Sequence, residues 1–256
     1  MESVVGIFRS RANAEGAVEG LKSLGVPEQD INLLTPGNER ELQRVPVVEG
    51  EQPGMGKAVG GVVGGALGAA TATLFVPGVG PVLAVGVVAA SLLGAAVGAI
   101  GGAAVGEKIE ESLGKGLPVD EMFIYEDALR KGRSVAIAFP KDDEQREQAT
   151  RLFVTEGAES LDAAREAWWV GLRPAEREHY TAAGNDFSAD EMNYRRGFEA
   201  ALSLPNRGRA YEENEGNLRR RHPDIYRERS FKAGYERGVE YHQRVCAQHK
   251  KETILI

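Results

Sequence analysis

A histidine, a cysteine and a second histidine near the carboxyl end are the residue types in this sequence best suited to hold a transition metal. His242, Cys246 and His249 follow one another at i, i+4 and i+7, so a helix would place them on one face. A soft thiolate with two imidazoles suits such a metal. No second ligand pair accompanies them, and a solvated or packing face is the alternative that we favour. We therefore expect no metal and no other cofactor.

A basic cluster, Arg219–His222, is a second candidate site. Beside a membrane, each arginine contributes about 1 kcal/mol of attraction to anionic headgroups. The alternative is a solvated cluster that is paired with the nearby Glu212, Glu213 and Glu215. The sequence leaves both possibilities open.

Enzyme motifs are missing from the sequence. It contains no G-x-S-x-G, no H-E-x-x-H and no P-loop ending in Gly-Lys-Ser/Thr. Its many G-x-G spacings follow no predicted strand and lack polar partners for a phosphate. We therefore expect a protein without enzymatic activity, with no catalytic and no cofactor-binding residue.

Charge and cysteine content narrow the class of partner and the compartment. The 256 residues carry a net charge of −7, and the only basic excess lies in residues 187–256. This balance disfavours bulk binding to nucleic acid, which needs a basic face. The single cysteine, Cys246, permits no intramolecular disulfide and fits a reducing compartment. The first residues lack the pattern of a secretory signal, so we expect a cytoplasmic start and no nucleic-acid partner.

The most unusual feature is a glycine-rich apolar segment. From Ala58 to Gly106, 49 consecutive residues carry no charged side chain, and nearly half of the 32 glycines lie in residues 54–106. The sequence VPGVGP at 76–81 divides the segment into arms at 58–75 and 82–105. Because one bilayer crossing needs about 20 apolar residues, the segment predicts a helical hairpin.

In both arms, glycines recur every fourth residue, which is one face of a helix. The predicted helix-packing residues are Gly56, Gly60, Gly64 and Gly68 in the first series and Gly86, Gly94, Gly98, Gly102 and Gly106 in the second. Such faces let the backbones of membrane helices approach closely. We therefore expect self-association through a glycine zipper.

Two environments are open to such a hairpin. In water each helical glycine costs about 1 kcal/mol relative to alanine, which disfavours the core of a large soluble oligomer. In a bilayer, the second arm is apolar enough to span alone, whereas the first arm needs a partner. Lys57, Lys108 and Lys115 flank the hairpin on what would be the cytoplasmic side. We expect membrane association, with lipid and further copies of the chain as partners and the soluble regions in the cytoplasm.

The segments on either side of the hairpin predict the two halves of one α+β domain. The predicted strands are 4–8, 31–35, 134–139 and 158–162, and the predicted helices lie near 14–24, 118–131 and 142–155. Each β-α-β unit is expected to pair its two strands in parallel. Two such units with their helices on one face make a ferredoxin-like sandwich.

The remainder predicts helices. We expect a helix break at Arg173-Pro174, a capping box at Ser188–Glu191 that opens a helix to about Leu204, and a last helix that Pro223 opens. Of the neighbouring Trp168 and Trp169, one ring should pack and one should be exposed, with a place at a membrane interface as the alternative.

Two segments of this region share the form aromatic-x-x-Gly-aromatic: YRRGF at 194–198 and FKAGY at 231–235. Two copies are too few for a solenoid. They predict a pair of helices that approach closely at their glycines, with the aromatic rings as packing anchors. The expected organisation is thus 1–36 and 107–162 as the halves of the α+β domain, 37–55 as a linker, 56–106 as the hairpin and 163–256 as a helical region.

The segments that flank the hairpin also resemble a known family. VVGIFRSRANAEGAVEGLKSLGVPEQDINLLTP, EMFIYEDALRKGRSVAIAF and LFVTEGAESLD are similar to the bacterial YflT-like general stress proteins, in variants with an inserted glycine zipper. The resemblance covers about residues 3–162. It implies a ferredoxin-like domain in a stress-associated protein and no catalytic or ligand-binding residue.

We expect from these features a non-enzymatic, membrane-associated stress-response protein that oligomerises through the hairpin. One alternative is a soluble self-assembling protein whose hairpins form the core of a large oligomer. A regulatory domain that binds a small ligand is the other.

Overall fold

A computed structural model describes residues 3–37, 62–64, 70–76, 79–86 and 119–254, which form an α+β protein. Contacts divide the chain into two compact units. Unit 1 contains the residues up to Val119 together with Ile124–Ala164, and unit 2 contains Asp120–Phe123 together with the residues from Arg165 onward.

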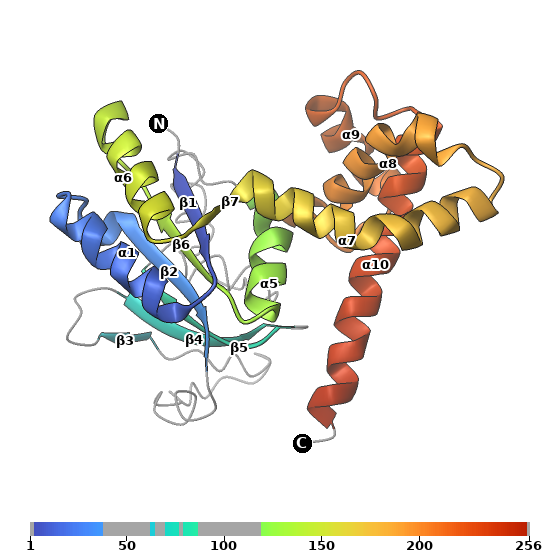
Figure 1. The fold of residues 1–256 in the computed structure, drawn as a ribbon. Coiled ribbons are helices and arrows are strands. Elements are labelled where there is room, and N and C mark those ends of the chain that lie inside the picture. Colours follow the sequence, from blue (N-terminus) through green and yellow to red (C-terminus); the bar gives the residue numbers. More distant parts are fainter. Residues whose placement is uncertain (1–2, 38–61, 65–69, 77–78, 87–118, 255–256) are drawn as a thin grey trace. The chain divides into compact units, whose positions relative to one another are not determined.

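Unit 1 is built on an antiparallel sheet of seven strands in its described part (Figure 1). Their order across the sheet is β3-β4-β5-β2-β6-β1-β7. The strands are β1 (Val4–Phe8), β2 (Ile31–Pro36), β3 (Val62–Gly64), β4 (Ala70–Val76), β5 (Gly80–Val85), β6 (Ser134–Ala138) and β7 (Glu159–Ser160).

The predicted direct pairing within each β-α-β unit is wrong, because β6 lies between β1 and β2, and β1 lies between β6 and β7. Ala136 of β6 is opposite Gly6 of β1 on one side and opposite Leu33 of β2 on the other, and both pairs are antiparallel. All five residues of β6 are buried. An apolar strand of this kind is most stable with a hydrogen-bonded partner on each edge, so it occupies the middle and leaves β1 and β2 parallel but one strand apart.

Two helices cover one face of this sheet, α1 (Arg11–Ser23) and α6 (Asp143–Thr155). Ser10 and Asp142 cap their first turns by accepting hydrogen bonds from backbone N–H groups. Beyond their last turns, Gly25 and Gly157 adopt φ values of 76° and 77°, which favour glycine. The predicted helices and their glycine ends are confirmed here.

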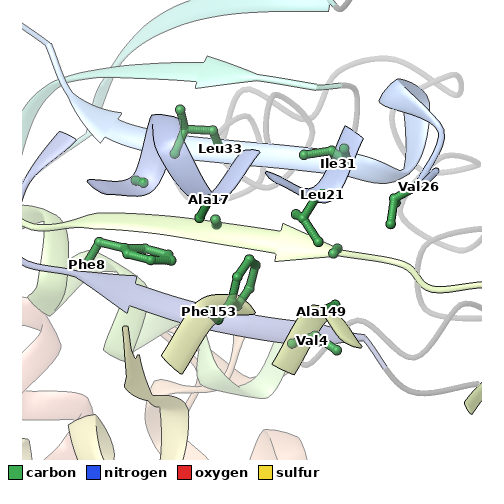
Figure 2. Packing of buried hydrophobic residues seen from close by; sticks show 12 residues of the cluster. Val4, Phe8, Ala17, Leu21, Val26, Ile31, Leu33, Ala149 and Phe153 are labelled. Carbon is green, nitrogen blue, oxygen red and sulfur yellow. The ribbon is translucent and has the colours of Figure 1, made fainter. Parts of the chain in front are cut away.

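The core between these helices and the sheet is apolar and closely packed (Figure 2). The rings of Phe8 and Phe153 meet edge to face with their centroids 5.4 Å apart. Around them pack Val4, Ala17, Leu21, Ile31, Leu33 and Ala149.

The opposite face of the sheet is also buried. Ile7, Leu34 and Ile137 point away from α1 and α6 by strand alternation, and each is inaccessible to solvent. On that side of the strands lies α5 (Met122–Arg130) (Figure 1). Tyr125 and Leu129 of this helix are buried.

The glycine-rich segment departs from its predicted structure. Residues 62–64, 70–76 and 80–85 are strands, so the predicted helical arms are wrong for this part of the segment. Its threonine, valine and phenylalanine residues favour strands, and glycine disfavours helices. A charge-free composition alone does not distinguish a buried helix from a buried strand.

Pairing with β2 explains why strands form. β5 is antiparallel to β2, with Val85 opposite Leu33 and Val82 opposite Pro36, so it satisfies an edge that would otherwise be open. The chain reverses between β4 and β5, with Val76 opposite Gly80. The predicted reversal at 76–81 is therefore confirmed, although it joins strands.

Unit 2 is helical in its described residues. Its helices are α7 (Leu161–Ala182), which begins in unit 1, α8 (Phe187–Leu202), α9 (Tyr211–Arg221) and α10 (Arg229–Ile254). The predicted break at Pro174 is wrong, because α7 continues through it. Trp168 and Tyr180 on either side of the proline are both buried, and we infer that packing outweighs the roughly 3 kcal/mol cost of an internal proline.

Two further boundaries differ from the predictions. Asp186, and not Ser188, caps α8, because its carboxylate accepts hydrogen bonds from the backbone N–H groups of Ser188 and Ala189 at 2.9 and 3.3 Å. The last helix begins at Arg229 instead of Pro223. The separate helix α9 precedes it, and its polar sequence carries too weak an apolar period to be predicted.

The predicted close approach of two helices at their glycines is confirmed. A Cβ atom added to Gly197 of α8 would overlap the carbonyl oxygen of Phe231, and one added to Gly234 of α10 would overlap that of Tyr194. The contact is reciprocal, since the glycine of each aromatic-x-x-Gly-aromatic segment packs on the first aromatic residue of the other. Only glycine permits backbones to approach this closely.

We predict that Gly197→Ala or Gly234→Ala lowers the free energy of unfolding of unit 2 by about 1–3 kcal/mol or more, because a methyl group must displace a backbone. Trp168 and Trp169, the chain's two tryptophans, lie in unit 2. Urea unfolding followed by their fluorescence therefore measures this effect.

The matched control is Gly216→Ala in α9, where an added Cβ has no neighbour within 4 Å. This change should stabilise the helix by up to about 1 kcal/mol. Equal effects at all three glycines would contradict the close contact between α8 and α10.

Candidate functional site

Two of the nine predicted helix-packing glycines lie in the described part of the chain. Gly64 ends β3, and Gly86 follows β5 with a φ of 102°, so neither is helical and the zipper prediction is wrong for both. An added Cβ at Gly86 would collide with the side chain of Asn32. The other seven lie outside the described residues: Gly56, Gly60, Gly68, Gly94, Gly98, Gly102 and Gly106.

No helix within the described ranges has both the length and the apolar character needed to cross a bilayer. The tryptophan prediction also fails, because both rings are buried, with Trp168 4% and Trp169 1% exposed. Trp169 donates a hydrogen bond from Nε1 to Glu191 at 3.0 Å. Its polar atom is thus satisfied inside unit 2.

The candidate metal ligands His242, Cys246 and His249 all lie on α10. The positions of the Cys246 and His249 side chains are outside the described part of the structure. Among the side chains that are described, no group of three or more His, Cys, Asp or Glu residues is arranged to hold a metal ion.

The basic cluster Arg219–His222 ends α9 and has different partners from those predicted. Arg221 forms an ion pair with Asp120, and Arg220 donates to Asn217 at 3.3 Å. Glu212 is instead paired with Lys232 at 2.7 Å. The cluster borders a cleft in unit 2.

One end of the sheet in unit 1 is formed by the glycine-rich segment. Of the strands that the structure describes, β3 is the last at that end, with Val63 opposite Thr71 of β4. Edge strands present unpaired N–H and C=O groups, and proteins commonly protect them with charges, prolines or very short strands. The other end is the two-residue β7, which carries Glu159. The uncharged end at β3 is our candidate functional site.

An apolar groove of about 430 Å³ lies beside α1 in the same unit. The register places Val85 opposite Leu33, on the sheet face that α1 covers, and Leu83 opposite Thr35. The floor is formed by Ile31, Leu33, Leu83 and Val85, and the rim includes the ion pairs Arg11–Glu15 at 2.7 Å and Lys22–Glu19 at 3.0 Å. Its polar groups are already paired, an arrangement that suits apolar contact and not acid–base chemistry.

A buried polar network joins three helices of unit 2. Glu176 is 2% exposed and accepts a hydrogen bond from the Tyr194 hydroxyl at 2.8 Å. Arg237 of α10 donates to the same carboxylate from Nε and Nη2 at 2.9 and 3.3 Å. Burial, with the nearby Glu176 charge, raises the pKa of Tyr194. These residues fix α7, α8 and α10 together, and sequence spacing held no signal for the network.

Glu191 forms a second polar network in unit 2, with Arg173 and Trp169. Its carboxylate accepts from Arg173 at 2.5 and 2.6 Å and from Trp169. The Arg173 hydrogen bond is the main cause that lowers the pKa of Glu191 to about 2. A carboxylate held in its charged form in this way is a poor acid–base catalyst near neutral pH.

Comparisons with known proteins add no relative: no protein-family model matches the chain, and no curated protein or solved structure is detectably similar. The resemblance to the general stress protein family stays a prediction.

We predict that Glu191 makes unit 2 less stable in acid. The pKa of Glu191 is lower in the folded state than in the unfolded state. Its contribution to the free energy of unfolding is therefore fully present above about pH 4.5 and is lost as the pH falls towards 2. Glu191→Gln should therefore reduce the loss of unfolding free energy between pH 5 and pH 3, measured by urea unfolding.

Glu178→Gln on α7 is the matched control, because Glu178 is exposed and has no hydrogen bond or ion pair with any described residue. It should leave the pH dependence as in the wild type. If Glu191→Gln has the same pH dependence as this control, the ion pair of Glu191 with Arg173 does not cause the loss of stability in acid.

Proposed function

We propose that this chain is a non-enzymatic assembly protein that self-associates through the sheet edge formed by its uncharged glycine-rich segment. The observation that carries the proposal is the position of β3 at the end of the sheet among the described strands, within a run of 49 residues that lacks any charged side chain.

Strand addition is the mechanism that this edge favours. A second copy can place its own β3 alongside, so that backbone hydrogen bonds continue the sheet across the contact. Two identical edges that pair antiparallel are related by a two-fold axis, which closes the assembly as a dimer. Charged side chains would oppose such a contact, and the nearest ones in sequence to β3 are Lys57 and Glu107.

The fold of unit 1 is in our proposal a ferredoxin-like domain with a three-strand extension. The strand order β7-β1-β6-β2, with α1 and α6 on one face, supports this assignment. The resemblance of residues 3–162 to the YflT-like family supports a role of this assembly in the bacterial stress response. Unit 2 would then be the module that each copy displays.

A membrane-associated role is the second candidate function, and the uncharged run is again the observation that favours it. Such a run can enter a bilayer without the cost of burying a charge. In this case lipid, and not only a second copy, would be the partner of the glycine-rich segment.

We predict that Val63→Lys weakens self-association by about tenfold or more, which corresponds to about 1.4 kcal/mol, because it places a charge on the edge strand. Light scattering of the purified chain over a range of concentrations measures the change. Val154→Lys on α6 is the control, because Val154 is 68% exposed and α6 packs on β1, which lies near the other end of the strand order from β3.

A wild-type chain that stays monomeric without lipid would contradict assembly through the edge. Flotation with phosphatidylcholine and phosphatidylglycerol vesicles separates the two candidate functions. If the chain is monomeric in water, and both the wild type and Val63→Lys float with the vesicles, the membrane role is favoured.

A further inference from the structure

Unit 2 contains a cleft of about 570 Å³ that the proposed assembly does not use. Basic side chains reach it from three helices, with Arg165 on α7, Arg196 on α8, and Arg221 at the end of α9 with His222 next to it. Such a volume lies within the usual range of about 300–1,000 Å³ for small-molecule sites.

Each carboxylate that lines the cleft already has an arginine partner. Arg165 holds Glu121 with two hydrogen bonds, one of them from Nε at 3.0 Å. Paired arginines neutralise these acids, so the carboxylates repel an anion less than their number suggests. The pairs are Glu121 with Arg165, Asp120 with Arg221, and Glu199 with Arg195.

Arg196 differs from the other two arginines that line the cleft, since Arg165 and Arg221 are both in ion pairs. It is exposed and lines the cleft, and it has neither a hydrogen bond nor an ion pair with any residue that the structure describes. The lining has three arginines and three carboxylates, but Glu199 is paired with Arg195 outside the lining, so the guanidinium of Arg196 keeps its donors available to a ligand. A guanidinium presents a planar set of N–H donors that fits carboxylate or phosphate oxygens.

The pKa of His222 responds to the charges around the cleft. It is half-buried, and its ring lies 5.2 Å from that of Phe231. Burial lowers the pKa of His222, the charges of Arg221 and Arg196 lower it further, and Asp120 acts in the opposite direction. A nearby anion would reverse the effect of the two arginines.

The wall of the cleft is partly apolar. Phe123 and Ala200 line it, and the ring of Phe123 packs on Trp168 with a centroid separation of 4.8 Å. This surface suits an uncharged organic group attached to the anion. The arginines of the last turn of α9 also offset the negative end of that helix, which would otherwise repel an anion.

We propose that this cleft binds a phosphate monoester. Arg196 holds the phosphate, Arg221 and His222 border it, and Phe123 and Ala200 contact the organic group.

The test is an NMR titration of the histidine ring protons of the full chain, with His222 assigned by His222→Gln. Glycerol 3-phosphate is the probe, and it should raise the pKa of His222 in a saturable way. Arg196→Ala should weaken binding at least tenfold and, without the probe, should itself raise the pKa of His222. Because Arg196 is exposed, we expect this variant to fold.

Arg219→Ala is the matched control, since Arg219 is exposed on the same basic cluster but does not line the cleft. It should change binding by less than twofold. Equal losses from Arg196→Ala and Arg219→Ala would show diffuse attraction to a basic surface and would overturn the site. The site would also be overturned if the pKa of His222 did not change at high concentrations of glycerol 3-phosphate and the chain did not bind phosphatidic acid vesicles.

Vesicles distinguish a lipid headgroup from a free ester. Phosphatidic acid carries the same phosphate monoester, and phosphatidylcholine vesicles serve as the reference. Binding of phosphatidic acid vesicles alone, lost in Arg196→Ala but kept in Arg219→Ala, supports the site with a lipid as its ligand. Saturable binding of glycerol 3-phosphate, with the same dependence on Arg196, supports a soluble ligand.

Discussion

Backbone hydrogen bonding along the sheet of unit 1 is the constraint on which the rest of that unit depends. β6 is buried at every residue, so its peptide groups need a partner strand on both edges. β1 and β2 supply them, and their separation leaves the outer edge of β2 to be filled by β5. Each further strand moves the edge of the described sheet outward, through β4 to β3. The proposed assembly continues the same process between copies of the chain.

Unit 2 depends on a different constraint, the distance at which two helices can cross. Gly197 and Gly234 remove side chains where α8 meets α10, and the aromatic residues of both segments then pack around the contact. Buried charge is accommodated only in pairs, as Glu176 is with Arg237. Arg196 is exposed, and it lines a cleft without a hydrogen-bond or ion-pair partner among the described residues.

Local signals in the sequence were sufficient to predict much of unit 1 and the close contact between α8 and α10. Capping by Ser10, the glycine ends at Gly25 and Gly157, and the shared aromatic and glycine spacing at 194–198 and 231–235 are encoded within a few residues. The coarse α+β class followed from them.

Features that depend on contacts distant in the chain were not predicted. Whether residues 70–76 form a helix or a strand depends on the open edge of β2, more than thirty residues earlier. Likewise Pro174 stays within α7 because of packing around it, and Glu191 binds Arg173 instead of completing a capping box. The cleft in unit 2 gathers residues from positions 120 to 222, a combination that no local pattern indicates.

The central claim is that chains associate through the β3 edge, and hydrogen exchange at that edge tests it most directly. Backbone amides of Val62–Gly64 should exchange more slowly as the concentration of the purified chain rises, while those of the opposite edge strand, β7, stay unchanged. Exchange at β3 that does not depend on concentration, in a sample that light scattering shows to be associated, would contradict the claim.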